Sequence, residues 1–205
     1  MKVALWLVAS YLLGAIPTSY LVGRIVKGVD LRRVGSRSLG ATNLYRSLGW
    51  KYAVPVALFD VAKGAIPVVG FGPRAGGGDW IPLALGGAAV LGHVFSVFVG
   101  FKGGKGVATA AGVVLAIAPW GTLVAAVTWL LVVWISGYVS LGSILAAAVL
   151  PVAAYALHPE RRHLWWLFVG LAGFVIVMHR ANIGRLRAGT ESRFGRRATV
   201  RPGEP

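Results

Sequence analysis

Three short polar segments contain the residues of this chain that are suited to binding or transferring a phosphorylated group. In the first, residues 35–46, Ser36, Thr42, Asn43 and Arg46 lie among glycines. Backbone amides and a guanidinium suit phosphate, which accepts several hydrogen bonds at once. Thr42 or Asn43 is also expected to cap a helix that runs through Arg46. An ordinary interfacial loop before a capped helix explains the composition equally well.

Glycines and lysines are concentrated in the second segment, residues 101–109, as Lys102, Gly103, Gly104, Lys105 and Gly106. The glycines allow backbone amides to approach a ligand closely, and Lys105 places an ammonium beside them. The segment is similar to a P-loop, but its spacing is one residue short and no Ser or Thr follows Lys105 to hold magnesium. Nucleotide binding is therefore not expected, whereas phosphate binding is. The simpler alternative is a tight turn between two helices.

The third segment, residues 179–191, begins at a histidine that ends an apolar run. His179, Asn182 and Leu186 share one face if the helix of that run continues. His179 is the best-placed candidate for a general base at neutral pH. The alternative is a basic anchor at the membrane surface with an interfacial histidine.

Several other polar residues lie within apolar runs. Asp60 and Lys63 have the i, i+3 spacing of an ion pair on one helix, and a structural pair is favoured over direct catalysis. His93 is expected to be hydrogen-bonded within a helical bundle, near the second segment. Ser140 and Ser143 are expected to pack against neighbouring helices, as small residues do in membranes.

The elements that must position these residues are membrane-spanning helices. Hydrophobic residues make up 57% of the 205 residues and charged residues only 13%, about half the share of a soluble domain. Seven apolar segments cover residues 3–23, 52–72, 80–100, 107–118, 120–135, 143–157 and 164–178. The sequence therefore predicts an all-α integral membrane protein, a bundle of about seven transmembrane helices. The fourth segment is short for a bilayer, so a five-span arrangement is the alternative. The first segment is expected to be a retained span rather than a cleaved signal peptide.

The charge pattern predicts how the chain is oriented. The formal net charge is +15, and 16 of the 21 Lys and Arg residues lie in residues 24–51, at Lys102 and Lys105, and from Arg180 onwards. The positive-inside rule then places the N-terminus outside and the C-terminus in the cytoplasm, with all three segments at the cytoplasmic face. Nucleic acid is not an expected partner, because most of the chain is too apolar. We expect residues 1–192 to form a single transmembrane catalytic domain and residues 193–205 a basic cytoplasmic tail near anionic headgroups.

The chain resembles the bacterial acyl-phosphate:glycerol-3-phosphate acyltransferases, small polytopic enzymes of phospholipid synthesis. In the first segment the similar residues are Gly35, Ser36, Gly40, Ala41, Thr42, Asn43 and Arg46. In the second they are Gly92, His93 and the unbroken run 101–109, and in the third His179, Arg180, Asn182, Ile183, Arg185, Leu186, Gly189 and Glu191. Asp60, Lys63 and Gly64 also look like a family feature. Three residues depart from the family pattern: Arg37 and Ser38 replace an expected Gly and Asn, and Ser96 replaces a common Pro. Arginine is costly where a glycine had a positive φ.

The resemblance implies transfer of a fatty acyl group from acyl phosphate to the 1-hydroxyl of glycerol 3-phosphate. It implies a bacterial inner-membrane location, membrane lipids as surroundings, and no cofactor or metal. The catalytic residues it implies are Ser36, Lys105, His179 and Asn182. The substrate- and phosphate-binding residues are Thr42, Asn43, Arg46, Gly103, Gly104, Gly106 and Ser143, with His93, Lys102, Arg185 and Glu191 as secondary candidates.

Three other functions are weighed against this one. Acyltransferases of the soluble type use a His-x4-Asp dyad, and none of the four histidines has Asp at that spacing. A transporter for an anionic metabolite would use Asp60 and Lys63 as part of a pathway, but the polar residues gather at one face. A scaffold that binds anionic lipid would not need the glycine–lysine segment. The absence of cysteine excludes thiolate catalysis and cysteine-ligated metal sites.

Overall fold

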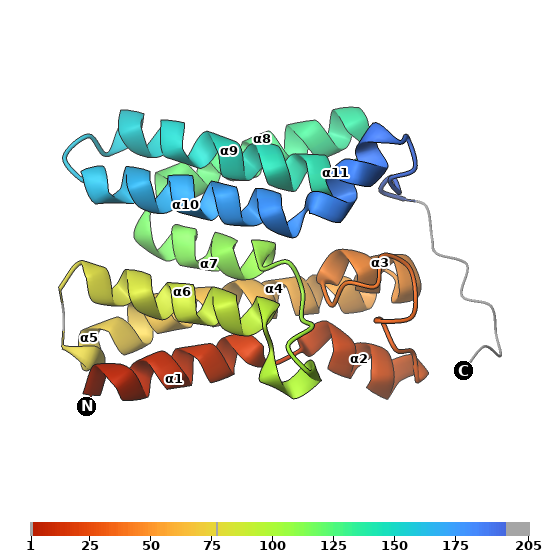
Figure 1. The fold of residues 1–205 in the computed structure, drawn as a ribbon, viewed down its shortest axis with the longest axis horizontal. Helices are drawn as coiled ribbons and strands as arrows, with labels where there is room; N and C mark the ends of the chain where they lie inside the picture. Colours follow the sequence, from red (N-terminus) through yellow and green to blue (C-terminus); the bar gives the residue numbers. More distant parts are fainter. Residues whose placement is uncertain (1, 77, 196–205) are drawn as a thin grey trace. The chain divides into compact units, whose positions relative to one another are not determined.

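All regular elements of the described chain, residues 2–76 and 78–195, are helices in the computed structural model (Figure 1). These residues divide into two compact units between Ala116 and Ile117. The first unit holds the first two polar segments and the second unit holds the third.

The first unit contains nine helical elements. They are α1 (Lys2–Ala15), α2 (Thr18–Lys27), α3 (Ala41–Leu48), α4 (Trp50–Ile66), the π-helical η1 (Pro67–Phe71), α5 (Gly72–Ala75), α6 (Trp80–Val94), the 3₁₀ turn η2 (Val97–Val99) and α7 (Val107–Ile117). Helix α1 is interrupted before Pro17, because proline cannot supply the backbone N–H that a continuous helix needs there.

Glycines bring the long helices of this unit into backbone contact. A Cβ at Gly14 of α1 would collide with the carbonyl of Ala89 in α6, and one at Gly92 of α6 would collide with Tyr11 of α1. In the same way, Gly64 of α4 lies against the carbonyl of Thr109 in α7, and Gly112 of α7 lies against the carbonyl of Val61 in α4. Close approach at small residues is how helices associate in lipid, where hydrophobic burial gives no advantage.

The second unit contains α8 (Pro119–Ser136), α9 (Val139–Leu157), α10 (Arg162–Met178) and α11 (Arg180–Arg187). Helix α9 packs against both α8 and α10. A bend of 60° separates α10 from α11. His179 lies at that bend, so the helix does not continue straight through it, and the condition for one face shared by His179, Asn182 and Leu186 is not met.

Five helical stretches of the described residues are long and apolar enough to cross a membrane, and there are six if the bent pair α10–α11 is counted as one span. The stretches are Lys2–Lys27, Trp50–Ala75, Trp80–Val99, Pro119–Ser136 and Val139–Leu157. The fourth apolar segment of the sequence forms α7, an apolar helix of only 11 residues. An all-α protein with membrane-spanning helices is thus confirmed, while the count of seven and the orientation of the termini stay predictions. Of the predicted tail, residues 196–205 lie outside the described chain.

Candidate active site

The loop of the first polar segment is organised by one carboxamide. Asn43 is buried in the first turn of α3, and its Nδ2 donates to the carbonyls of Leu31, Val34 and Ser38, each at 3.1 Å. Its Oδ1 accepts the backbone N–H of Ser36 at 3.0 Å.

The predicted capping role for Thr42 or Asn43 is wrong. Helix α3 already begins at Ala41, and its N-cap is Gly40, which has no side chain to cap with. Thr42 and Asn43 therefore lie inside the first turn, where the Asn43 side chain satisfies the preceding loop rather than the helix end.

Arg37 shows that the loop keeps a glycine-like conformation without the glycine. Its φ is +57°, in the left-handed region that costs an ordinary residue about 1–2 kcal/mol. The sequence predicts this conflict, because Arg37 stands where the family pattern has Gly. The hydrogen bonds that Asn43 makes on either side of Arg37 offset this strain.

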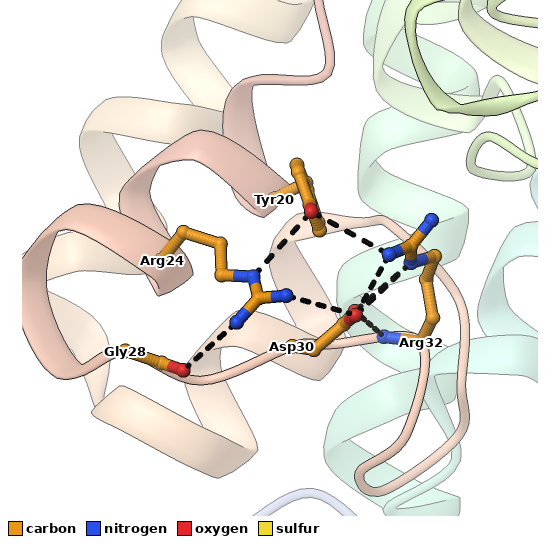
Figure 2. Close-up of polar contacts among 5 residues, drawn as sticks. All are labelled: Tyr20, Arg24, Gly28, Asp30 and Arg32. Carbon is orange, nitrogen blue, oxygen red and sulfur yellow. Dashed lines mark hydrogen bonds and ion pairs between the residues drawn. The ribbon is translucent and has the colours of Figure 1, made fainter. Parts of the chain in front are cut away.

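The chain that leads into this loop is fixed by a cluster around Asp30 (Figure 2). The Asp30 carboxylate accepts two hydrogen bonds from Arg32 Nε and one from Nη2 at 2.8 Å, and Arg24 lies 3.5 Å away. Both guanidinium groups lie over the Tyr20 ring. Arg24 also reaches the carbonyl of Gly28. The hydrogen bond from Arg32 is the main cause that lowers the pKa of Asp30 to about 2.

The second polar segment folds back onto the end of α6. Gly103 N–H donates to the Val94 carbonyl at 2.9 Å, and Gly104 N–H donates to the His93 carbonyl at 3.1 Å. A Cβ at Gly104 would lie 2.6 Å from the carbonyl oxygen of Leu39 and would collide with His93 Nε2. The first two polar segments are therefore in contact at Leu39 and Gly104, and only glycine fits there.

Ser96, the residue that replaces a common proline, keeps the proline-like backbone. Its φ is −68°, close to the value that a proline ring imposes. Its buried hydroxyl also donates to the carbonyl of Ala15, where α1 ends. This departure from the family pattern therefore preserves the turn that follows α6.

A buried ionic cluster lies in the same unit. Lys63 Nζ is 2.7 Å from Asp60 Oδ1, so the predicted ion pair is confirmed. His93 Nδ1 lies 3.8 Å from the same carboxylate oxygen. Arg46 on α3 is buried. Lys105 is half-buried in the second polar segment, residues 101–109, which is called the glycine loop below.

The third polar segment is organised by Glu191 in the second unit. Ser140 Oγ donates to its Oε1 at 2.8 Å, Asn182 Nδ2 donates to the same oxygen at 2.6 Å, and Arg185 Nε donates to Oε2 at 2.6 Å. Burial alone would raise the pKa of Glu191, but these hydrogen bonds outweigh it and lower the pKa. Ser140, expected only to pack, is thus part of this network.

His179 has a defined tautomer at the bend between α10 and α11. Its Nδ1 lies 2.8 Å from the carbonyl oxygen of Val175, an acceptor, so Nδ1 carries the proton in the neutral ring. The lone pair is then on Nε2. Ser143, on α9, donates to the Val139 carbonyl within its own helix, as a packing serine does.

No group of three or more His, Cys, Asp or Glu residues within residues 2–76 and 78–195 could hold a metal ion. The structure brings the first two polar segments together in one unit and gathers Asn182, Arg185 and Glu191 in the other. Assembly of all three segments into one site remains a prediction.

Known proteins of one family match this chain over most of its length. Residues 4–189 match the family model described as glycerol-3-phosphate acyltransferase. The glycerol-3-phosphate acyltransferases of Chlorobaculum tepidum and Trichlorobacter lovleyi are 44% and 47% identical, over 93% and 92% of this chain and 97% and 96% of theirs. Crystal structures of PlsY, an integral membrane glycerol 3-phosphate acyltransferase, give TM-scores of 0.88 for the glycerol 3-phosphate form and 0.86 for the lysophosphatidic acid form. The glycerol 3-phosphate form is 40% identical and covers 95% of this chain and 96% of its own. The lysophosphatidic acid form is 38% identical and covers 96% of this chain and 97% of its own.

Proposed function

The chain belongs to the glycerol-3-phosphate acyltransferase family, and we propose that it transfers a fatty acyl group from acyl phosphate to the 1-hydroxyl of glycerol 3-phosphate. The products are lysophosphatidic acid and inorganic phosphate, and the reaction is the first acylation of phospholipid synthesis. The observation that carries the proposal is the contact between Leu39 and Gly104, which joins two phosphate-type segments in one unit. Solved relatives in glycerol 3-phosphate and lysophosphatidic acid forms support it.

The phosphate groups are bound chiefly by cations, because the N–H groups of Gly103 and Gly104 already donate to the carbonyls of Val94 and His93. Arg46 and Lys105 supply the charge, and Gly103, Gly104 and Gly106 supply a backbone that no side chain obstructs. Lys102 is a secondary contact at the exposed end of the loop. Thr42 donates to phosphate, while Asn43 acts on the loop through the hydrogen bonds described above.

Ser36, His179 and Asn182 position the acceptor hydroxyl or the reacting carbonyl, and Ser143 supplies a further contact. Asn182 donates through Nδ2 to Glu191, and its Oδ1 is buried without a partner among residues 2–76 and 78–195. That oxygen is an acceptor suited to a substrate hydroxyl. Glu191 and Arg185 keep the carboxamide in this orientation.

The chemical step needs no covalent intermediate on the enzyme. The 1-hydroxyl oxygen attacks the acyl carbonyl carbon, a new C–O ester bond forms, and the bond from that carbon to the phosphate oxygen breaks. Phosphate leaves with the electron pair of that bond. The hydroxyl proton goes to His179 Nε2 or to an oxygen of the donor phosphate. Acyl phosphate is already an activated mixed anhydride, so the protein needs only to align the reactants and stabilise charge.

The chain is an all-α integral membrane protein, as its solved relatives are. We propose seven crossings of a bacterial inner membrane, with the N-terminus outside and a single catalytic domain, residues 1–192, whose three polar segments form one cytoplasmic site. Because the chain has no cysteine, single cysteines test this cleanly. Arg33→Cys should react with a membrane-impermeant thiol reagent only after cells are permeabilised, and Glu160→Cys in intact cells. The reverse pattern excludes this orientation.

The activity is tested with purified protein, glycerol 3-phosphate and palmitoyl phosphate, with lysophosphatidic acid measured. Product is expected with palmitoyl phosphate and not with palmitoyl-CoA. If no product forms under conditions in which a relative from Chlorobaculum tepidum produces it, the enzyme function is wrong, and a transporter or a lipid-binding scaffold takes its place.

A further inference from the structure

The ion pair between Asp60 and Lys63 lies inside a membrane-spanning stretch, where charged side chains are unfavourable. Both side chains are almost fully buried, at 2% and 1% exposed, within a membrane-spanning stretch. A charged side chain within a membrane span is unfavourable because the hydrocarbon does not solvate it. Buried ion pairs add little net stability over apolar residues of the same volume. Helix packing alone therefore does not explain why α4 carries this pair.

The pair is held in place from the break between α1 and α2. Lys63 Nζ donates to the carbonyl of Ile16 at 2.9 Å, one of the backbone groups that the break leaves without a helical partner. Thr18 Oγ1 donates to Asp60 Oδ1 at 3.3 Å. These contacts fix where the Asp60 carboxylate points.

The Asp60 carboxylate faces one edge of His93, and the glycine loop faces the other edge. His93 Nδ1 lies 3.8 Å from Asp60 Oδ1, and Nε2 lies so close to Gly104 that a Cβ there would collide with it. The carbonyl of His93 also accepts the N–H of Gly104. The imidazole thus fills the space between the ion pair and the loop, and it is itself 8% exposed.

We infer that Asp60, held by Lys63, orients the His93 ring, and that the ring sets the position of the Gly103–Gly104 backbone, which places Lys105 at the substrate phosphate. Asp60, Lys63 and His93 are positioning residues, because they act on the reaction through the loop. The inference rests on the proposed function in one respect, that the glycine loop binds phosphate.

His93→Asn and His93→Gln separate the two edges of the ring. Asparagine keeps a polar nitrogen near the Nδ1 position but does not reach Gly104, whereas glutamine reaches toward the loop without the ring's edge at Asp60. Each variant should raise the KM for glycerol 3-phosphate or palmitoyl phosphate by about tenfold while kcat changes by less than about threefold. His158→Asn, in the other unit, should change neither constant. Unchanged KM values for both substrates in both His93 variants would overturn the inference.

The double variant Asp60→Asn/Lys63→Met tests whether the ion pair acts through His93. Removing both charges leaves no lone buried charge, and thermal unfolding in detergent checks that the protein folds. In the wild-type background the KM should rise about tenfold, and in the His93→Asn background by less than about twofold, because the connection is already broken. If the double variant also raises the KM about tenfold in the His93→Asn background, the ion pair does not act through His93.

Thr18→Val, which keeps the side-chain volume, gives a second measure if the double variant does not fold. Loss of one hydrogen bond to Asp60 should raise the same KM by about twofold to fivefold, and no rise contradicts the inference. Failure of the proposed function gives a different result, since the wild-type protein would then form no lysophosphatidic acid at all.

Discussion

The backbone N–H of Ser36 donates to the side-chain Oδ1 of Asn43 at 3.0 Å, while the Nδ2 of the same carboxamide holds three carbonyls of the loop. One side chain on α3 therefore sets the backbone that carries Ser36. The loop needs no ligand to acquire its shape, because its polar groups are satisfied from within the fold. Preorganisation of this kind is what lets donors stabilise charge without a cost of reorganisation during the reaction.

Replacing Asn43 with Asp should therefore disrupt the loop although the shape of the side chain is kept. The carboxylate can still accept from Ser36, but it cannot donate to Leu31, Val34 or Ser38, whose oxygens would repel it. Loss of a buried hydrogen bond costs about 1–3 kcal/mol, so the unfolding temperature should fall by several degrees and the KM for substrate should rise. Ser38→Ala is the control, because only the backbone of Ser38 is used. Equal effects of the two substitutions would contradict this role for Asn43.

Replacement of Arg37 by glycine should stabilise the folded protein. Arg37→Gly removes the left-handed strain, worth about 1–2 kcal/mol, at the expense of the greater freedom of glycine in the unfolded chain. We expect a gain of about 0.5–1 kcal/mol and a rise in unfolding temperature of about 2–4 °C. Arg37→Ala removes the charge and keeps the Cβ, so it should give no such gain. A rise of the same size in Arg37→Ala would assign the effect to charge instead.

The sequence predicted the contacts that are local along the chain. Asp60 and Lys63 are three residues apart on one helix, so their ion pair follows from helical spacing. The strain at Arg37 follows from an Arg in a glycine position. By contrast, Ser140 and Glu191 are 51 residues apart, and the loop contact of Gly104 with Leu39 depends on how the helices pack. No periodicity encodes such contacts.

The errors also have physical causes. The sequence predicts a capping role for Thr42 or Asn43, because both residue types cap helices well. In the structure Gly40 precedes the helix, and the carboxamide of Asn43 finds four partners in the loop instead. One face through His179 required the helix to continue straight, but the helix bends there by 60°, and the sequence has no proline or glycine at that position to indicate a bend.

The cluster around Asp30 predicts how stability changes in acid. The pKa of Asp30 is lowered from its ordinary 3.8 to about 2, chiefly by the hydrogen bond from Arg32. The ionised carboxylate therefore stabilises the folded state fully above about pH 4, and this contribution is lost as the pH falls towards 2. Asp30→Asn should lower the unfolding temperature by about 2–4 °C at pH 7, and the difference from wild type should shrink below pH 4. The measurement is thermal unfolding in detergent between pH 3 and 8 for both proteins. A difference that stays constant with pH would show that the charge of Asp30 is not what holds the loop.

Glu191 should tolerate loss of its charge poorly. Glu191→Gln keeps the volume, but the amide cannot accept from Ser140, Asn182 and Arg185 together, and the orientation of Asn182 is no longer fixed. Activity should fall by at least about a hundredfold, and Ser140→Ala, which removes one donor, should have a smaller effect of about threefold to tenfold. Glu160→Gln is the matched control, since the side chain of Glu160 is 66% exposed. If Glu191→Gln retains full activity, the network does not position Asn182.

His179→Asn distinguishes an enzyme base from a substrate base better than a change to alanine. The Nδ1–H of His179 faces the Val175 carbonyl at 2.8 Å, and the amide nitrogen of asparagine can take over that hydrogen bond. The bend between α10 and α11 then keeps its support, while the Nε2 lone pair is gone. If Nε2 accepts the proton of the substrate hydroxyl, kcat should fall by about 10²–10⁴ with little change in the unfolding temperature, and His179→Ala should be equally inactive and less stable. The measurement is kcat from lysophosphatidic acid formation, beside thermal unfolding of each variant. Near-normal turnover by a folded His179→Asn protein would instead assign the proton to an oxygen of the donor phosphate, because that group is the other acceptor present at the reacting carbon.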